Sequence, residues 1–336
     1  MMALMDFLPW HLLNQAGGER SVWLPPQSSL TALQVDWNFY FILAICTFFF
    51  VLVTVVTLFF VFRFRYKEGV GPQPSPTHNT SLEITWSVIP LIIVLFIFYF
   101  GFKGYMDLQV PPGDAYEIQV TGQKWKWFFT YTRPYYYVSD ELHVPVNQPV
   151  RLVITSEDVL HSVYVPAFRV KMDAVPGRFT KAWFDATQTG EYPLFCAEYC
   201  GTDHSNMNTI VVVHERGQFE KWLEDAANYI DRIAEGDVVA LSEAGRDLYR
   251  RKGCLQCHSI DGTVKNGPTF KGMFGKVEPM RDGSQVEVEE NYIRESVLDP
   301  QAKVLAGFDP IMPTFKGKLK DKEILAIIEY IKSLKE

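Results

Sequence analysis

Cysteine and histidine are scarce in this chain: its 336 residues include only five cysteines and seven histidines. The sequence also lacks internal repeats, a nucleophilic triad, a glycine-rich phosphate loop and a basic nucleic-acid-binding surface. These absences argue against a hydrolase with an activated nucleophile, a phosphate-loop nucleotidase and a nucleic-acid-binding protein. The few thiols and imidazoles therefore carry most of the chemical information, and their spacing directs the interpretation.

Charge is missing from two long stretches near the N-terminus. Residues 39–62 and 84–102 contain no charged side chain. At a rise of about 1.5 Å per residue, each run is long enough to cross a hydrocarbon core of about 30 Å. Pro90 in the second run is tolerated in a membrane helix, where neighbouring groups satisfy the freed backbone. The alternative is a pair of buried helices in a soluble protein, but such helices are rarely this long and uncharged. We therefore predict a transmembrane hairpin.

Basic residues follow the first apolar run directly, at Arg63, Arg65 and Lys67. Loops rich in Lys and Arg stay in the cytoplasm, so the connection between the two helices is expected on that side. The first run starts too late and is too long for a cleaved signal peptide. We therefore expect a two-helix protein of a prokaryotic plasma membrane, with both termini and everything after Lys103 outside the cytoplasm.

The middle of the chain contains short runs of β-branched and aromatic residues separated by Gly and Pro. The predicted strands are 115–120, 126–131, 150–155 and 209–213. Strands at this spacing indicate an all-β sandwich or barrel.

Residues 105–236 carry eleven basic and eighteen acidic side chains, a net charge of 11 − 18 = −7. That charge would either attract a basic partner or form an ordinary solvated surface.

The rest of the chain predicts helices over 217–234, near 244–252 and over 321–334. The expected fold is that of a multi-domain membrane protein with a transmembrane α-helical hairpin, an all-β domain and an all-α C-terminal domain. The expected segments are 1–38 outside the membrane, the hairpin at 39–104, the β domain at 105–216, a helix and linker at 217–236, and the C-terminal domain at 237–336.

Cys254, Cys257 and His258 form the sequence Cys-Leu-Gln-Cys-His, the attachment pattern of c-type haem. In this pattern the two thiols bond the haem vinyl groups and the histidine ligates the iron. A redox dithiol or half of a zinc site is the alternative. Neither requires the histidine, and no second cysteine pair follows to complete a zinc site. Haem c is attached outside the cytoplasm, which agrees with the orientation expected from the loop charges.

The second axial ligand of that haem must come from farther along the chain. The downstream methionines are Met273, Met280 and Met312, and no histidine follows His258. Met312 lies between Pro310 and Pro313, in a stiff loop suited to presenting a thioether, and is the predicted ligand. Met273 is expected to pack in the core, as most lone methionines do. Ligation by His and Met raises the reduction potential of a haem.

The remaining informative thiols are Cys196 and Cys200, which His204 and Met207 follow closely. A disulfide across so short a loop would stabilise little and would leave His204 and Met207 unexplained. Zinc would accept both cysteines with His161 and His204, but it has little use for a thioether. Thiolates, imidazoles and a thioether together select copper. A mononuclear blue-copper site uses one cysteine, so the second thiolate favours two coppers bridged by both sulfurs.

These residues resemble the CuA site of cytochrome c oxidase subunit II. The matching pattern is Asp158-Val-Leu-His161-Ser162, followed by Cys196-x-Glu198-x-Cys200-x-x-x-His204-x-x-Met207. The resemblance implies a cupredoxin-like fold for the β domain. It also implies terminal ligands at His161 and His204, bridging ligands at Cys196 and Cys200, and weak ligands at Met207 and the Glu198 carbonyl. In the family the Glu198 side chain also reaches a magnesium ion at the interface with subunit I.

Two other segments are similar to the same family. Gly122-Gln-Lys-Trp-Lys-Trp127 resembles the aromatic segment that receives electrons, with Trp125 at the receiving position and Lys126 where an aromatic is common. Residues 78–86 resemble the start of the second membrane helix, and they place Glu83 at the mouth of a proton path into subunit I. Without the resemblance, Trp125 would be interpreted as strand packing and Glu83 as an interfacial anchor.

The C-terminal region resembles small bacterial cytochromes c through Lys252-Gly-Cys, Gly267-Pro268 and Met312-Pro313. This resemblance implies that the Pro268 carbonyl orients His258. The two resemblances cover residues 36–230 and 237–336, and together they imply subunit II of a caa-type oxidase. Subunits I and III, membrane lipid and an external donor such as cytochrome c or another small redox protein are the expected partners, with no nucleic acid.

The implied function is electron input to a haem-copper oxidase, from the donor through haem c and CuA to haem a of subunit I. Oxygen would be reduced to water, with coupled proton translocation, on the other chain. A CuA subunit of a nitric oxide reductase is an alternative, because the difference would lie in the partner chain. A free-standing, membrane-anchored electron carrier or copper-handling protein is another. Nitrous oxide reductase would need a large propeller domain, for which the chain has no room.

Overall fold

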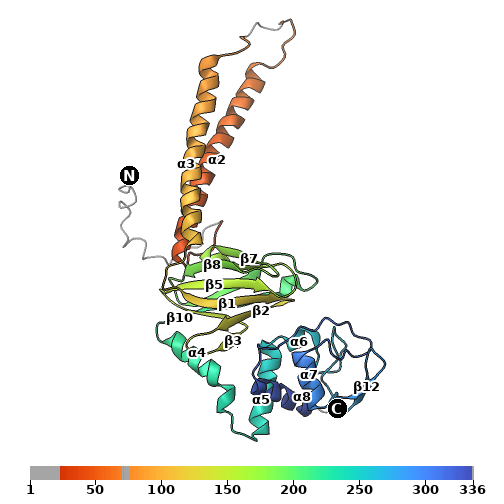
Figure 1. Ribbon diagram of the computed structural model, residues 1–336. Coiled ribbons are helices and arrows are strands. Elements are labelled where there is room, and N and C mark those ends of the chain that lie inside the picture. The colour runs from red at the N-terminus through yellow and green to blue at the C-terminus, as the bar shows by residue number, and fades with distance from the viewer. Residues whose placement is uncertain (1–22, 70, 72–75, 335–336) are drawn as a thin grey trace.

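A long helical hairpin stands on a β-sandwich, and a mainly helical region packs beside the sandwich (Figure 1). The structure, a computed structural model, describes residues 23–69, 71 and 76–334. The expected N-terminal segment 1–38 therefore lies partly outside the described residues. The three parts confirm the predicted fold class of hairpin, all-β domain and helical C-terminal domain.

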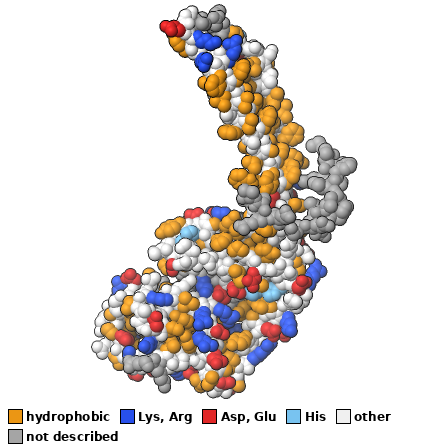
Figure 2. All heavy atoms as spheres, turned by 180° about the vertical axis from the view of Figure 1, so that it is seen from behind, with side chains coloured by type: hydrophobic (Ala, Val, Ile, Leu, Met, Phe, Trp, Pro, Cys, Tyr) orange, Lys and Arg blue, Asp and Glu red, His pale blue; other side chains and the backbone are white. Residues whose placement is uncertain are grey.

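The hairpin consists of α2 (Leu30–Arg63) and α3 (Thr80–Gln109). Ser29 and Asn79 cap the two helices, and each side chain accepts a hydrogen bond from a backbone N–H in the first turn. Both helices are long and apolar enough to span a membrane, and their most apolar windows are not buried inside the structure. Figure 2 shows hydrophobic side chains along the hairpin and Lys and Arg side chains at its far end.

Both helices extend beyond the uncharged runs toward the β-sandwich. α2 begins at Leu30, after its N-cap Ser29, rather than at residue 39, and Asp36 in its first turns is paired with Arg169 of the sandwich. The two side chains are 6% and 7% exposed and are joined by a 2.7 Å contact. α3 continues past the expected boundary at 104 to Gln109, where the Asp107 carbonyl accepts a hydrogen bond from Trp183 Nε1. These contacts fix the hairpin to the β domain.

Ten strands form the β domain. They are β1 (Tyr116–Gln123), β2 (Lys126–Tyr131), β3 (Tyr137–Ser139), β4 (Leu142–Pro145), β5 (Pro149–Ser156), β6 (His161–Val165), β7 (Val170–Ala174), β8 (Thr180–Asp185), β9 (Gly190–Cys196) and β10 (Asn208–His214). Each of the four predicted strands is present, as β1, β2, β5 and β10. Two 3₁₀ turns, η1 (Pro166–Phe168) and η2 (His204–Asn206), interrupt the connections.

The strands form two five-stranded sheets, in the orders β3-β2-β1-β5-β8 and β4-β10-β9-β6-β7. The pairs β1–β5 and β4–β10 are parallel, and the other pairs are antiparallel. β5 alternates between half-buried and buried residues, as expected for a strand with one face against a core. The buried faces of both sheets form one apolar core that includes Trp127, Phe129 and Leu194. This core extends to Cys196, Cys200 and Met207, so the sulfur ligands lie at its edge.

The regular structure after the β domain is mainly helical. The helices are α4 (Gln218–Asn228), η3 (Ile230–Arg232), α5 (Val238–Arg251), the single-turn α6 (Cys254–Cys257), α7 (Glu290–Leu298) and α8 (Asp321–Ser333). The helix predicted over 217–234 ends as α4 at Asn228 and is followed by a 3₁₀ turn. A short hairpin of β11 (Val277–Pro279) and β12 (Gln285–Glu287) is an addition to the expected helical domain. α5 and α8 pack against each other, with Gly245 too close to the Ala326 carbonyl to permit a Cβ.

Candidate metal centre and haem pocket

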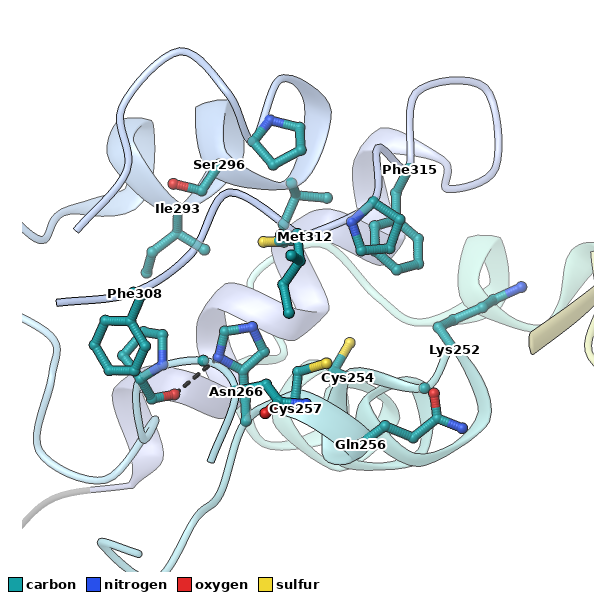
Figure 3. Close-up of a pocket in the computed structure, with 18 of the residues that line it drawn as sticks. Lys252, Cys254, Gln256, Cys257, Asn266, Ile293, Ser296, Phe308, Met312 and Phe315 are labelled. Carbon is teal, nitrogen blue, oxygen red and sulfur yellow. Dashed lines mark hydrogen bonds between the residues drawn. The ribbon is translucent and has the colours of Figure 1, made fainter. Parts of the chain in front are cut away.

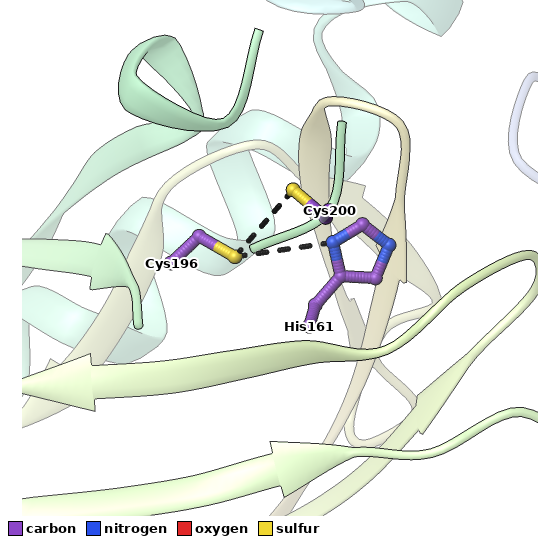
Figure 4. Close-up of side chains that lie close together, drawn as sticks. All are labelled: His161, Cys196 and Cys200. Atoms are coloured by element: carbon purple, nitrogen blue, oxygen red, sulfur yellow. Dashed lines mark hydrogen bonds between the residues drawn. The ribbon is translucent and has the colours of Figure 1, made fainter. Parts of the chain in front are cut away.

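Sulfur and nitrogen donors gather where three segments of the second sheet meet. His161 is the first residue of β6, Cys196 is the last residue of β9, and Cys200 lies in the loop that leads to η2. His161 is fully buried, and both cysteines are buried beside it (Figure 4). The donor atoms of these three residues all lie within 4.8 Å of one another.

The donors form a short chain with the two sulfurs in its middle. Cys196 Sγ lies 3.8 Å from Cys200 Sγ and 3.9 Å from His161 Nδ1. On the other side, Cys200 Sγ lies 3.5 Å from His204 Nδ1 and 3.7 Å from Met207 Sδ. Cys196 therefore lies next to His161, Cys200 lies next to His204, and the two thiols lie next to each other.

A disulfide does not account for this cluster. The sulfurs are 3.8 Å apart, whereas a disulfide bond is about 2.05 Å long. The Glu198 carbonyl oxygen adds a sixth donor, 3.3 Å from Cys196 Sγ. Six donors are more than the four that a structural zinc site takes. Two thiols, two imidazoles, a thioether and a carbonyl fit a pair of copper ions better, because soft sulfur ligands favour copper.

Asp158 fixes the orientation of His161. Its Oδ1 accepts a hydrogen bond of 2.8 Å from His161 Nε2, which leaves Nδ1 facing Cys196. The carboxylate is itself held by the backbone N–H groups of Lys124 and Val159. A carboxylate behind a histidine is the usual arrangement around a metal-binding imidazole. The Asp158-Val-Leu-His161 spacing thus positions a ligand and its support together.

The two thiols differ in acidity. Burial opposes ionisation of Cys196, but hydrogen bonds from His161 and from backbone groups outweigh it and lower the pKa of that thiol to about 6. Burial, together with the negative charge on Cys196, raises the pKa of Cys200 to about 12. Cys196 is therefore the thiol of the pair that ionises first. A bound cation would favour loss of the second proton, since metals bind the thiolate.

A second pocket surrounds the Cys-Leu-Gln-Cys-His sequence. Cys254 and Cys257 occupy the two ends of α6, so both sulfurs project from one turn of helix. In Figure 3 they lie on one side of the pocket and Met312 lies on the other. The lining is mainly apolar and includes Phe270, Ile293 and Phe315. An apolar cleft with two thiols and an imidazole suits a covalently attached haem.

His258 is held rigidly at the edge of this pocket. Its Nδ1 lies 2.8 Å from the Pro268 carbonyl oxygen, so Nδ1 carries the proton and donates. The ring stacks on Phe270 at a centroid distance of 4.5 Å. A Cβ at Gly267 would lie 2.7 Å from His258 Cε1, so only glycine permits this approach. Nε2 is left as the nitrogen able to bind iron.

The downstream methionines separate into two groups. Met280 is 2% exposed and packs in the core of the helical domain, behind residues that line the pocket. Met273 and Met312 both line the pocket, whereas the sequence predicts only a core position for Met273. The assignment of Met312 as the axial ligand stays a prediction, because geometry leaves both thioethers within the lining.

Three further predicted functional residues are Trp125 and Glu198, which lie beside the metal cluster, and Glu83, which lies far from it on α3. Trp125 packs on the metal loop, where a Cβ on Gly201 would lie 3.2 Å from its Nε1. The Glu198 side chain is exposed while its carbonyl faces Cys196. Glu83 lies in the first turn of α3, where its Oε1 accepts a hydrogen bond from the Asn79 N–H. This contact gives Glu83 a helix-capping role.

Three family models match the chain. Residues 18–103 match the transmembrane domain of cytochrome c oxidase subunit II, residues 134–214 match its periplasmic domain, and residues 242–335 match cytochrome c. The cytochrome c oxidase subunit 2 of Alkalihalophilus pseudofirmus is 30% identical over 266 residues, which cover 76% of this chain and 74% of that protein. The chain belongs to the cytochrome c oxidase subunit II family.

Other proteins are similar in sequence to parts of this subunit II. The Bacillus subtilis cytochrome c oxidase subunit 2 is 29% identical over 281 residues, or 76% of this chain and 75% of that protein. The Thermostichus vulcanus protein of the same name is 45% identical over 116 residues, 34% of this chain and 35% of that protein. A crystal structure of the periplasmic domain of Bradyrhizobium japonicum subunit II is 34% identical, with a TM-score of 0.34, and covers 36% of this chain and 99% of that domain.

Membership in the subunit II family has direct consequences. The protein is a membrane-anchored subunit of a cytochrome c oxidase, with a fused C-terminal cytochrome c domain. The two domain families imply a CuA copper centre and a haem c, and the oxidase complex implies subunit I as a partner. The buried cluster of His161, Cys196 and Cys200 is consistent with the copper centre.

Sequence reasoning missed a histidine pair in the β domain of this subunit II. His143 Nδ1 lies 2.8 Å from His214 Nε2, and the His143 ring stacks on Trp222 of α4 at 3.7 Å. His143 lies on β4 and His214 on β10, two parallel strands with no sequence proximity. The apolar runs around His143 and His214 could have placed each residue on a strand, but only the pairing of β4 with β10 brings the two rings together.

The histidine pair predicts a loss of stability in acid. Burial, followed by the charge of His143, lowers the pKa of His214 from 6.5 to about 4. Between these pH values the unfolded chain binds a proton at His214 that the folded chain does not. The contribution of neutral His214 to the free energy of unfolding is therefore complete above pH 6.5 and is lost as the pH falls toward 4. We expect His214→Gln to flatten the pH dependence of the unfolding midpoint in that interval, as measured by near-ultraviolet circular dichroism of the full chain in detergent. An unchanged slope in the variant would contradict this assignment.

Proposed function

We propose that this chain is the electron-input subunit of a caa-type haem-copper oxidase. It accepts electrons from an external donor at its cytochrome c domain and passes them through its copper domain to haem a of subunit I. The partner chain then reduces oxygen to water and translocates protons. Cytochrome c or another small redox protein is the donor, and subunit III is a further partner.

The observation that supports this proposal is the nearness of the two sites. Gln123, Lys124 and Lys126 of the copper domain line the haem pocket. Trp125, between them in sequence, packs on Gly201, the residue after Cys200. The ring of Trp127 lies 5.9 Å from that of His161. One short segment thus contacts both sites, as a route for electrons requires.

Each binding site has residues that hold it in a single arrangement. When bound, haem c and a binuclear copper centre supply one-electron carriers. His161, Cys196, Cys200, His204, Met207 and the Glu198 carbonyl are the proposed copper ligands, and Asp158 holds His161 in place. Cys254, Cys257, His258 and Met312 are the proposed haem residues, and the Pro268 carbonyl holds His258. Rigid ligands limit the rearrangement that accompanies electron transfer.

The exposed groups suit contacts with subunit I. The Glu198 side chain is exposed and is the proposed ligand of a magnesium ion shared with that subunit. Glu83 is the proposed mouth of a proton path, at the end of the hairpin away from the β domain. With Arg63, Arg65 and Lys67 near the same end, the proposed orientation puts the hairpin connection in the cytoplasm and both folded domains outside, in a prokaryotic plasma membrane.

Purification of the tagged full chain from its native membrane in mild detergent tests the proposal. We expect a multi-span protein with haem a to copurify, and we expect the complex to consume oxygen with reduced cytochrome c as donor. A matched preparation of the Cys200→Ser variant should retain the partner but lose at least 90% of the oxygen consumption, since electrons would no longer leave the copper domain.

Two results would overturn the proposal. A complex that reduces nitric oxide but consumes no oxygen would identify a nitric oxide reductase. A chain that carries both metals but copurifies with no haem protein would identify a free-standing electron carrier.

A further inference from the structure

The cytochrome c domain is docked on the copper domain through Lys318. This lysine lies in the turn between Met312 and α8, and its side chain is 11% exposed. Its Nζ lies 2.6 Å from Glu157 Oε2 and 3.0 Å from Gln123 Oε1, both on the copper domain. Gln123 Nε2 in turn donates to Glu157 Oε2 at 3.0 Å, so the three side chains form one closed network.

Apolar contacts surround this network. Lys318 Nζ lies 4.8 Å from the ring centroid of Phe128, close enough for a cation–π interaction. Phe128 also meets Phe315 edge to face, at 6.3 Å between centroids. Phe128 and Val138 belong to strands of the copper domain, yet both are buried in the hydrophobic core of the cytochrome domain. The contact is therefore a packed interface with a charged lysine at its edge.

Other polar contacts cross the same interface. Lys252 is 3% exposed and donates to the Val138 carbonyl. The Tyr136 hydroxyl donates to the Gly317 carbonyl at 2.7 Å, directly beside Lys318. Lys252 and Tyr136 have a backbone carbonyl as partner, whereas Lys318 pairs with a side-chain charge. Of these three contacts, the one made by Lys318 is the one that a charge reversal turns from attraction into repulsion.

Docking completes the haem pocket and covers the face around Trp125. The copper domain supplies Gln123, Lys124, Lys126 and Phe128 to the pocket lining. Lys126 reaches across the interface, where its Cδ would lie 2.7 Å from a Cβ on Gly253, next to Cys254. Lys126, which occupies a position where the family commonly has an aromatic residue, thus contacts the chain's own cytochrome domain.

We propose that Lys318 is a positioning residue that locks the cytochrome c domain onto the copper domain, through Glu157, Gln123 and Phe128. The locked arrangement closes the haem pocket against the segment that contains Trp125, so the electron-receiving face of the copper domain is reserved for this chain's own haem. An external donor then meets the cytochrome domain instead. This inference rests on the proposed electron-input function and adds the residue that sets its geometry.

Charge reversal at Lys318 tests the lock. In Lys318→Glu, two carboxylates face each other and the cation over Phe128 is lost, so the domains should separate more often. We expect amide hydrogen exchange in β2 and β3 of the full chain to accelerate by about tenfold, the factor that corresponds to about 1.4 kcal/mol. The double variant Lys318→Glu/Glu157→Lys restores an opposite pair and should return exchange to within about threefold of the native chain.

Lys332 offers a matched control. It pairs with Glu290 and Glu329 and lies 5.5 Å from the ring centroid of Phe274, all within the cytochrome domain. Lys332→Glu therefore removes two ion pairs and a cation–π contact without touching the interface. We expect exchange in β2 and β3 to stay at the native rate. The haem spectrum verifies that each variant retains a folded cytochrome domain.

A second measurement links the lock to electron transfer. After photoreduction of the haem, we expect the rate of electron transfer to the copper centre to fall at least tenfold in Lys318→Glu and to recover in the double variant. Native exchange rates in Lys318→Glu, or no recovery in the double variant, would overturn the inference. Failure of the proposed function would be distinct, because it would appear in the copurification, as nitric oxide reduction or as a missing partner haem protein, while the exchange comparison still reported on docking.

Discussion

We expect replacement of Cys200 with serine to abolish copper binding and to leave the haem in place. We expect the native chain, produced with haem-maturation machinery, to carry about two coppers and one covalently bound iron. Cys200 Sγ is the atom that lies near Cys196, His204 and Met207 at once, at 3.8, 3.5 and 3.7 Å. A serine oxygen is a harder donor than a thiolate and would hold copper less tightly. The affinity should therefore fall by more than the roughly 10–100-fold that loss of a supporting group costs.

Metal analysis and electron paramagnetic resonance measure this effect. Cys46→Ser is the matched control, because Cys46 is a free thiol exposed on the membrane helix α2. Its copper and iron contents should equal those of the native chain. Zinc in place of copper, or an oxidised Cys196–Cys200 pair after reconstitution with copper, would contradict the assignment of a CuA centre.

We expect replacement of Met312 with leucine to lower the reduction potential of haem c. A thioether ligand favours ferrous iron, and axial ligands change haem potentials over a range of about 0.8 V. Leucine is close to methionine in volume, so the pocket should stay packed while the sulfur is lost. We expect the potential to fall by on the order of 0.1 V or more, and the charge-transfer absorption of methionine-ligated ferric haem to disappear. A potentiometric titration followed by visible spectroscopy measures both.

Met273→Leu separates ligation from packing. Met273 lines the same pocket, so its replacement makes a similar change in volume and polarity. If Met312 is the ligand, Met273→Leu should keep the charge-transfer absorption and shift the potential only slightly. The reverse pattern, with the absorption lost in Met273→Leu alone, would transfer the axial role to Met273.

The two redox sites were predictable because their chemistry is local in sequence. Cys196 to Met207 fall within one loop and one 3₁₀ turn, and Cys254 to His258 fall within one turn of helix and the residue after it. In such short segments the side-chain spacing already limits which atoms can meet. His161 was predicted from the family resemblance, and the pairing of β6 with β9 brings it next to Cys196.

Contacts between distant segments were not predictable in the same way. The uncharged run that starts at residue 39 indicated a membrane helix, but it did not show that the first turns of this helix pack on the β domain through Asp36 and Arg169, 133 residues apart. The histidine pair required two strands to lie in parallel, and Met273 required the loop after α6 to fold back over the haem pocket. No periodic pattern of apolar residues contains this information.

Composition and motif alone predicted the membrane anchor, the order of the domains and the two cofactors that the matching domain families imply. Hydrophobic length and metal–ligand preference act on neighbouring residues, and a linear pattern records them. The docking of the cytochrome domain was decided by tertiary structure alone. Lys318 meets Glu157 across 161 positions of sequence, and Lys252 meets Val138 across 114. Such pairs form only when two separately folded surfaces match in shape and charge, and that match is a property of the folded domains rather than of any one segment.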